Sequence, residues 1–294
     1  MTALADVKSI LKDRGLHLNK KLGQHLLTDP NIRRKIIEMA KLSENDFVIE
    51  IGAGMGYMTE EIIRHAAKVT AIEIDRGFVA YLRDRFKDTK NLDIIHGDVL
   101  KSDLTAMCEK GRNAGHKIKI LGNLPYNINA PIIIRIAETR TPVDLCCFVV
   151  QKEVADRYTS QPGTKLYGAI VIYLQYRFSL TKTFVIPKEC FFPKPDVESA
   201  AITLIPHPVP PVNILDEALF FSIVRTAFSQ RRKMIGNSLK RLSGYEEKHD
   251  EIEEALKVAG IDRDERPENL PIESFTAIAN ALSLESREKI RRKS

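Results

Sequence analysis

The sequence of 294 residues lacks tryptophan and contains only four cysteines. None of the cysteines has the spacing of a metal site, and Cys146 and Cys147 are adjacent in an apolar segment, which is typical of buried thiols in a reducing compartment. The apolar runs, such as residues 132–134 and 148–150, are far shorter than the roughly 18 residues that span a bilayer. Residues 1–14 lack the apolar centre of a signal peptide. We therefore expect a soluble cytoplasmic protein with neither a metal site nor a membrane segment.

The composition that remains is that of a folded protein, with 44% hydrophobic and 29% charged residues and a net charge of +6. The charge is uneven. Residues 1–41 contain nine Lys or Arg and four Asp or Glu, and residues 225–241 contain six Lys or Arg and no acid. Because phosphate contacts dominate nucleic-acid affinity, these segments predict an anionic partner, although a solvated charged surface is the alternative. The six candidates for RNA contact are Arg225, Arg231, Arg232, Lys233, Lys240 and Arg241.

Residues 47–150 alternate short apolar segments with amphipathic segments, which predicts a parallel, doubly wound α/β sheet. The expected strands are 47–51, 69–74, 92–95, 118–121 and 145–150, with helices over 57–65 and 78–86. A further helix over 168–177 is followed by two strands, 178–186 and 200–205, with no helical pattern between them. This order predicts an antiparallel hairpin at the edge of the sheet.

Four prolines within residues 206–211 interrupt every regular pattern, because proline cannot continue a helix or a central strand. Beyond them the sequence has only helical patterns, over residues 214–229, 232–242, 247–259 and 272–283. Apolar residues recur at helical spacing through the basic segment, at Phe228, Ile235, Leu239 and Leu242. We predict an α/β domain over residues 1–205, a proline-rich linker over 206–212 and a small all-helical domain over 213–294.

A glycine-rich segment, Glu50–Gly56, follows the first expected strand and precedes a helix. Glycines in this place allow a tight turn and close approach of a ligand to a helix N-terminus, although ordinary turns also use glycine. Glu73 ends the second strand and Asp98 follows the third, where acids can accept hydrogen bonds from a ribose and an adenine; solvated strand ends are the alternative. The spacing is Gly-x-Gly-x-Gly with Tyr57 next, which favours S-adenosylmethionine over a nicotinamide dinucleotide.

The fourth expected strand ends in Asn123, Leu124, Pro125 and Tyr126. An aromatic amine is a poor nucleophile, because its lone pair is delocalised into the ring. The Asn123 amide oxygen and a backbone carbonyl beside Pro125 could accept both amine hydrogens and hold the nitrogen toward tetrahedral geometry, while Tyr126 stacks on the base. A plain β-turn is the alternative, since Asn and Pro both favour turns.

With these motifs the chain resembles the rRNA adenine N6,N6-dimethyltransferases of the small-subunit (KsgA) type, over nearly its whole length. The shared motifs lie at Lys21–Leu27, Glu50–Gly54, Gly97–Leu100, Gly122–Ile128, Gln151–Val154, Phe191–Ser199 and Phe228–Lys233. The resemblance implies a Rossmann-like methyltransferase fold that uses S-adenosylmethionine. It implies dimethylation of two adjacent adenines of small-subunit rRNA within a pre-ribosomal particle, during ribosome biogenesis. We expect a monomer, because nothing in the sequence demands a larger assembly.

The resemblance also implies roles for single residues. Asn123, Leu124 and Tyr126 would hold the target amine, Pro125 would fix the backbone between them, and Phe191 would form a second aromatic wall. For Phe191, capping of a loop or packing in the core is the alternative. The cofactor would be lined by Gln24, His25, Leu27, Gly52, Gly54, Glu73, Ile74, Asp98, Val99 and Asn123. The chain departs from the common family pattern at His25, Leu26, Ala53 and Asn129, where Asn, Phe, Pro and Ser are usual.

Three other functions fit parts of the sequence. A large-subunit rRNA adenine methyltransferase of the macrolide-resistance type would share most of the motifs, but the segment Phe228–Lys233 resembles the small-subunit group more closely. A non-catalytic RNA-binding assembly factor would not need the intact segment Asn123–Tyr126. A nicotinamide oxidoreductase would require the third glycine of the dinucleotide fingerprint, which position 57 lacks.

Overall fold

The computed structural model describes residues 3–19, 22–138, 143–230 and 233–293. The chain forms two compact units. The first comprises Met1–Ala155 with Leu180–Pro206, and the second comprises Asp156–Ser179 with His207–Ser294. Residues 156–179, which precede the predicted boundary at residue 205, therefore belong to the second unit.

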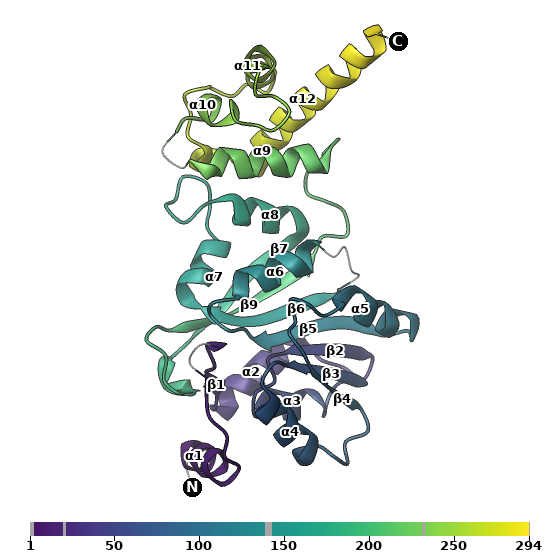
Figure 1. Ribbon diagram of the computed structural model, residues 1–294, viewed down its shortest axis with the longest axis vertical. Coiled ribbons are helices and arrows are strands. Elements are labelled where there is room, and N and C mark those ends of the chain that lie inside the picture. Colours follow the sequence, from purple (N-terminus) through teal and green to yellow (C-terminus); the bar gives the residue numbers. More distant parts are fainter. Residues whose placement is uncertain (1–2, 20–21, 139–142, 231–232, 294) are drawn as a thin grey trace. The chain divides into compact units, whose positions relative to one another are not determined.

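A seven-stranded sheet forms the centre of the first unit, in the order β4-β3-β2-β5-β6-β9-β7 (Figure 1). The four pairs among β2 to β6 are parallel, and β9 pairs with β6 in the antiparallel direction. The predicted doubly wound sheet is thereby confirmed, and the two predicted edge strands, β7 and β9, are neighbours at one edge. The strands are β2 (Asp46–Ile51), β3 (Lys68–Glu73), β4 (Leu92–His96), β5 (Lys117–Asn123), β6 (Leu145–Gln151), β7 (Phe178–Ile186) and β9 (Ser199–Pro206).

The chain order reverses between β2 and β5, because β3 and β4 lie on one side of β2 and β5 and β6 lie on the other. Such a switch point leaves a crevice at the carboxyl ends of the strands, where open α/β sheets bind ligands. Every residue of β2 is buried, as expected of a strand covered on both faces. This topology brings the segments after Ile51 and Asn123 together.

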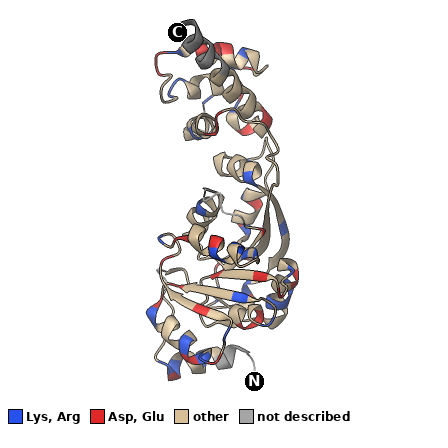
Figure 2. Ribbon diagram, turned by 90° about the vertical axis from the view of Figure 1, so that its right-hand side faces the viewer, with Lys and Arg blue, Asp and Glu red and all other residues tan. Residues whose placement is uncertain are grey.

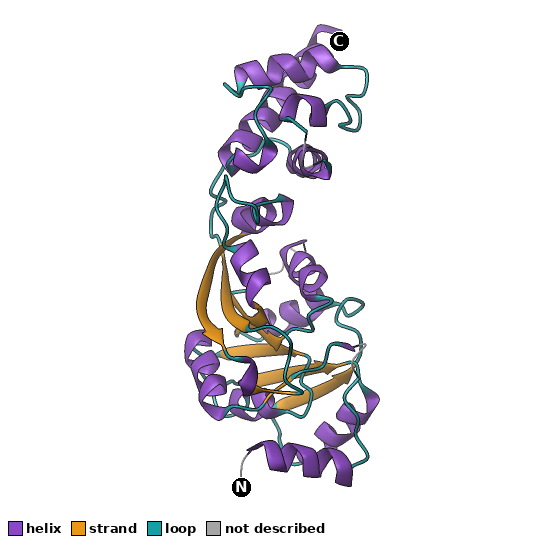
Figure 3. Ribbon diagram, turned by 90° about the vertical axis from the view of Figure 1, so that its left-hand side faces the viewer, coloured by secondary structure: helices purple, strands orange, loops and turns teal. Residues whose placement is uncertain are grey.

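Helices cover both faces of this sheet (Figure 3). Several begin at an aspartate whose side chain accepts hydrogen bonds from the first turn: Asp29 caps α2, Asp75 caps α4 and Asp103 caps α5. Such a cap contributes about 1 kcal/mol to a helix. The helices of this part of the chain are α1 (Ala3–Asp13), α2 (Pro30–Ala40), α3 (Tyr57–Ile62), α4 (Arg76–Arg85), α5 (Leu104–Asn113), α6 (Asn129–Glu138) and α7 (Lys152–Tyr158).

A second, two-stranded sheet was not predicted from the sequence. It consists of β1 (Leu26–Leu27) and β8 (Phe191–Phe192), which pair in the antiparallel direction. A short 3-10 helix, Lys188–Cys190, precedes β8. Strands of two residues are too short to show an alternating pattern, so only the tertiary structure reveals that these distant segments meet.

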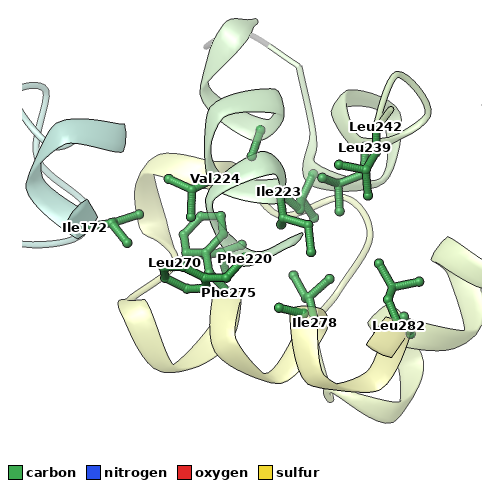
Figure 4. Close-up of a cluster of buried hydrophobic side chains, with 14 of the residues drawn as sticks. Ile172, Phe220, Ile223, Val224, Leu239, Leu242, Leu270, Phe275, Ile278 and Leu282 are labelled. Atoms are coloured by element: carbon green, nitrogen blue, oxygen red, sulfur yellow. The ribbon is translucent and has the colours of Figure 1, made fainter. Parts of the chain in front are cut away.

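The second unit is built from helices around one hydrophobic core (Figure 4). The helices are α8 (Ala169–Arg177), α9 (Glu217–Ser229), α10 (Ile235–Leu239), α11 (His249–Val258) and α12 (Ile272–Lys293), with a 3-10 helix at Pro267–Asn269. The apolar pattern of the basic segment is divided between two helices, because Phe228 belongs to α9 whereas Ile235 and Leu239 belong to α10. These apolar residues all pack in the same core, so their spacing in the sequence results from burial and not from one continuous helix.

Candidate functional site

A pocket of about 940 Å³, counting its open mouth, lies at the carboxyl ends of the strands on either side of the switch point. It belongs entirely to the first unit. The structure brings all of the predicted cofactor residues to its wall: Gln24, His25, Leu27, Gly52, Gly54, Glu73, Ile74, Asp98, Val99 and Asn123.

The glycine-rich segment turns beneath this pocket in a conformation that other residues rarely adopt. Gly54 and Gly56 have φ angles of 55° and 76°. A Cβ atom on Gly56 would also lie 2.6 Å from the ring of Phe86, so a side chain is excluded there by space as well as by backbone angle. The backbone N–H of Gly54 donates to Glu73 Oε2 at 2.8 Å, which ties the loop to the end of β3.

Two acidic side chains of the pocket are buried, and burial is the main cause that raises the pKa of each. Glu73 is 4% exposed, and its two oxygens accept hydrogen bonds from the backbone of Gly54 and Asp75. Glu50 is 1% exposed, and its pKa is raised to about 7. Each Glu73 oxygen has a second lone pair, so this carboxylate can still accept from ribose hydroxyl groups. The glycine turn allows a ligand to approach the backbone closely, and the acidic side chains at the strand ends can bind hydroxyl groups and positive charge. Together they suit a cationic nucleoside cofactor.

Asn123, at the end of β5, is held in one orientation. Its Nδ2 atom donates a hydrogen bond to the backbone oxygen of His25 at 2.5 Å. The amide oxygen, Oδ1, is consequently the atom that remains for an incoming donor. The following residue, Leu124, is 1% exposed, and its N–H donates to the Val149 carbonyl at 3.0 Å, which anchors the loop to β6.

Tyr126 is fixed by its ring and by its hydroxyl group. Its ring stacks on His25 with centroids 5.2 Å apart and planes 25° apart. Its hydroxyl oxygen lies 2.8 Å from Ser199 Oγ, and its backbone oxygen accepts from Asn129 Nδ2 at 2.6 Å. The His25 Nδ1–H donates to the Pro193 carbonyl at 2.7 Å. Pro125 lines the pocket beside Asn123, so Tyr126 lies next to the wall of the pocket and is held there by these contacts.

Three of the predicted amine-holding residues do not line the pocket: Leu124, Tyr126 and Phe191. The placement of Phe191 also differs from its predicted role. Phe191 is 3% exposed and belongs to the hydrophobic core, where it pairs with Leu27 in the small sheet. The predicted stacking of Phe191 on a target base does not fit this placement, because its ring is covered by the core. The sequence pattern could not distinguish Phe191 from its half-buried neighbour Phe192.

The predicted RNA-binding residues lie in the second unit. Arg225, Lys233 and Arg241 are exposed and Lys240 is half-buried, whereas Arg231 and Arg232 lie outside the described residues. Within the described part of the chain, none of the four placed side chains has an ion-pair partner. Charged residues of both signs occur in both units (Figure 2), and in the second unit α11 is rich in acids.

Three further residues of the site, Glu50, Tyr57 and Ser199, had no role that could be predicted from the sequence. Tyr57 lines the pocket, and the guanidinium groups of Arg33 and Arg85 lie 5.1 and 5.5 Å from its ring centre. An acid inside the apolar strand 46–51 was a signal that could have identified Glu50, because unpaired acids are rarely buried.

The structure contains no group of three or more His, Cys, Asp or Glu that could hold a metal ion, among the residues it describes. None of the described helices is both long enough and apolar enough to cross a membrane.

Comparison with known proteins identifies relatives along almost the whole chain. The family model described as ribosomal RNA adenine dimethylase matches residues 15–284. The ribosomal RNA small subunit methyltransferase A of Lysinibacillus sphaericus is 40% identical over 276 residues, which is 94% of each chain. The protein of the same name from Streptococcus pneumoniae is 38% identical over 276 residues, covering 94% of this chain and 95% of its own.

Solved structures share the fold. A dimethyladenosine transferase from Plasmodium falciparum has a TM-score of 0.72 at 24% identity, covering 90% of this chain and 98% of its own. The 23S rRNA methyltransferase ErmE has a TM-score of 0.67 at 23% identity, covering 88% and 99%.

Proposed function

Because the chain belongs to the ribosomal RNA adenine dimethylase family, we propose that it dimethylates two adjacent adenines of small-subunit rRNA within a pre-ribosomal particle. It is an rRNA adenine dimethyltransferase, and its methyl donor is S-adenosylmethionine. The observation that carries the assignment of its reacting site is the bond from Asn123 Nδ2 to the His25 carbonyl, which presents Oδ1 to a substrate amine.

The cofactor residues follow from the lining of the pocket. Glu73 would accept hydrogen bonds from the ribose, Asp98 would accept from the adenine amino group, and the turn at Gly52 and Gly54 would carry the methionine part. When bound, S-adenosylmethionine supplies an electrophilic methyl group on a sulfonium sulfur.

The residues after β5 hold the nucleophile. Asn123 Oδ1 accepts one N–H of the adenine amine and the Leu124 carbonyl accepts the other, so the nitrogen lone pair points into the pocket. Pro125 has no N–H that could compete. With the amine held in this way, the methyl group of bound S-adenosylmethionine would pass from sulfur to nitrogen, and the amine would release its extra proton to solvent. A second transfer to the same nitrogen gives the dimethylated base.

Tyr126 offers the aromatic face for a base that has left its helix. Its contacts with His25, Ser199 and Asn129 fix the plane of the ring before the substrate arrives. Phe191 supports this site from the core, below the pocket wall. A preformed stacking surface lowers the entropy that binding of a flipped base costs.

The second unit would bind RNA through Arg225, Lys233, Lys240 and Arg241, with Arg231 and Arg232 assigned by sequence alone. The relatives at about 40% identity are named as small-subunit enzymes, which disfavours the large-subunit alternative. The intact site after β5 disfavours a non-catalytic assembly factor. We place the reaction in the cytoplasm, where bacterial ribosomes assemble, with the protein acting as a monomer.

Small-subunit particles that lack adenine dimethylation provide the test. They are incubated with the protein and S-adenosylmethionine, and modified adenines are mapped by mass spectrometry, with protein-free rRNA and large-subunit particles in parallel. We expect two adjacent dimethylated adenines, in the small-subunit particle. Methylation confined to large-subunit RNA, or no methylation of any substrate, would refute the proposal. The molar mass of the purified protein, measured by light scattering, tests whether it is a monomer.

A further inference from the structure

The charged groups on the wall of the pocket are of one sign. Three carboxyl side chains line it, Glu50, Glu73 and Asp98, and no Lys or Arg does so within the described part of the chain. A wall of this kind attracts a cation and gives no compensating contact to a net negative ligand.

The arginines beside the pocket are already engaged. Arg33 and Arg85 approach the ring of Tyr57, which is itself part of the wall. Arg33 donates to the Thr28 carbonyl at 2.8 Å, and Arg85 pairs with Glu60 at 2.5 Å. Arg33 also donates to the Leu27 carbonyl and Arg85 to the Met55 carbonyl, so both guanidinium groups are held by backbone oxygens behind the wall, and neither arginine lines the pocket itself.

Glu50 is the most buried of the three acids, at 1% exposure. From α3, the hydroxyl group of Thr59 donates to its Oε2 at 2.6 Å. Its neighbours in the sheet, Ala71 on β3 and Leu121 on β5, are apolar. The charged group that acts on it is a second acid, Glu73, also from β3. Among the described residues no cation acts on Glu50, so a cationic ligand would be its positive partner.

We propose that Glu50 is a specificity-determining residue, whose carboxylate makes the pocket prefer the cationic methyl donor over its neutral by-product. S-adenosylmethionine carries a sulfonium, an ammonium and a carboxylate, with one net positive charge. S-adenosylhomocysteine has a thioether in place of the sulfonium and has no net charge. Loss of the methyl group therefore removes the charge that Glu50 attracts, which favours exchange of product for fresh donor. This inference rests on the proposed function and concerns the same pocket.

The preference depends on pH in a defined direction. Burial raises the pKa of Glu50 to about 7, with the Thr59 hydrogen bond lowering it and Glu73 raising it. Around neutral pH the free protein is thus partly protonated at Glu50. A bound cation favours the carboxylate, so binding releases a proton and becomes tighter as the pH rises through 7. If Glu50 is fully ionised in the complex, the affinity increases about tenfold between pH 6 and pH 8, because the ionised fraction of Glu50 in the free protein increases by that factor.

Isothermal titration calorimetry without RNA tests the inference. Wild-type protein is titrated with S-adenosylmethionine, sinefungin (a cationic analogue) and S-adenosylhomocysteine at pH 6, 7 and 8, in buffers of different ionisation enthalpy. We expect the two cations to release a proton near pH 6.5 and to bind about tenfold more tightly at pH 8 than at pH 6. We expect the by-product to change by less than about twofold.

Glu50→Gln keeps the side-chain shape and an acceptor for Thr59. In this variant we expect the ratio of the dissociation constants of S-adenosylhomocysteine and S-adenosylmethionine to fall about tenfold at pH 8. We also expect the protein to lose the part of the proton release that comes from the Glu50 carboxyl group. Glu61→Gln, on α3 but outside the pocket lining, should leave both unchanged. Equal proton release by both ligands, or an unchanged preference in Glu50→Gln, would overturn the inference. Failure of S-adenosylmethionine to bind at all would instead refute the proposed function.

Discussion

The side-chain nitrogen of Asn123 donates a hydrogen bond to the backbone oxygen of His25, over 2.5 Å. These residues are 98 positions apart in the chain and meet at the wall of the pocket. Because the acceptor is a backbone atom, the orientation of the Asn123 amide depends on the path of the N-terminal segment and not on the side chain at position 25. The two residues can therefore be tested separately.

Asn123→Ala removes the acceptor for the substrate amine. We expect kcat to fall by a factor of about 10² to 10³, as for the loss of one aligned polar group in an active site. The dissociation constant of S-adenosylmethionine, measured by calorimetry, should change by less than about threefold, because Gly52, Gly54 and Glu73 still line the pocket. A variant with wild-type kcat on small-subunit particles would eliminate the amine-holding role.

Replacement of His25 distinguishes the role of its ring from the role of its backbone carbonyl. His25→Ala retains the carbonyl that orients Asn123 but loses the stack on Tyr126 and the bond to Pro193. We expect a loss in kcat of about tenfold, consistent with the 0.5–1.5 kcal/mol of an aromatic pair and smaller than that of Asn123→Ala. His25→Phe, which keeps an aromatic ring, should recover part of this loss. An effect of His25→Ala as large as that of Asn123→Ala would show that the backbone path has also changed.

The opposite end of the sheet contains a buried ion pair that serves stability. Lys119 Nζ lies 2.8 Å from Asp46 Oδ2 and also donates to the Lys41 carbonyl at 2.6 Å. Asp46 is fully buried, so Lys119→Ala leaves an uncompensated charge in the interior. We expect the free energy of unfolding in urea to decrease by about 3–5 kcal/mol.

Lys68→Ala provides the control for this measurement, since its pair with Asp93 is partly exposed. Its cost should stay below about 1 kcal/mol. Equal decreases in the free energy of unfolding for Lys119→Ala and Lys68→Ala would mean that water or protonation stabilises Asp46 once Lys119 is removed.

The parallel sheet could be predicted because short, mainly apolar strands alternate with amphipathic segments, and the predicted strand 178–186 has the limits of β7. The strand-end residues Glu73 and Asp98 of the pocket wall could be predicted because the carboxyl ends of parallel strands meet at one edge, whereas Gln24, His25 and Leu27 followed only from the family resemblance. Contacts between distant segments could not. Nothing local indicates that Leu27 pairs with Phe191, that Tyr126 reaches Ser199, or which amide atom of Asn123 faces the substrate. Each depends on tertiary structure, as does the membership of residues 156–179 in the second unit.

Glu50 should also affect stability as a function of pH. Its pKa in the folded state is about 7, above the value of about 4.3 in an unfolded chain. A carboxyl group whose pKa is raised on folding destabilises the protein above pH 7, and this penalty disappears as the pH falls from 7 toward 4. We therefore expect Glu50→Gln to raise the free energy of unfolding by roughly 3 kcal/mol at pH 8 and to have little effect at pH 4. Urea denaturation at both pH values measures this, and a variant that is less stable at pH 8 would contradict it.

Exposed basic residues of the second unit should control the salt dependence of RNA binding. Arg225, Lys233 and Arg241 are exposed, and substitution of all three by Gln removes three positive charges without disturbing the core. Each phosphate contact contributes about 0.7–0.9 to the slope of log K against log salt concentration, so we expect the slope to decrease by about 2. Filter binding to small-subunit particles between 50 and about 200 mM salt measures this.

The control is Lys257→Gln on the acid-rich α11, where a nearby phosphate would be repelled and the slope should not change. Equal slopes for the triple variant and the wild type would place the RNA on another surface. An unchanged dissociation constant of S-adenosylmethionine in the triple variant would show that the first unit is still folded, so that a smaller slope reports RNA contacts of the second unit.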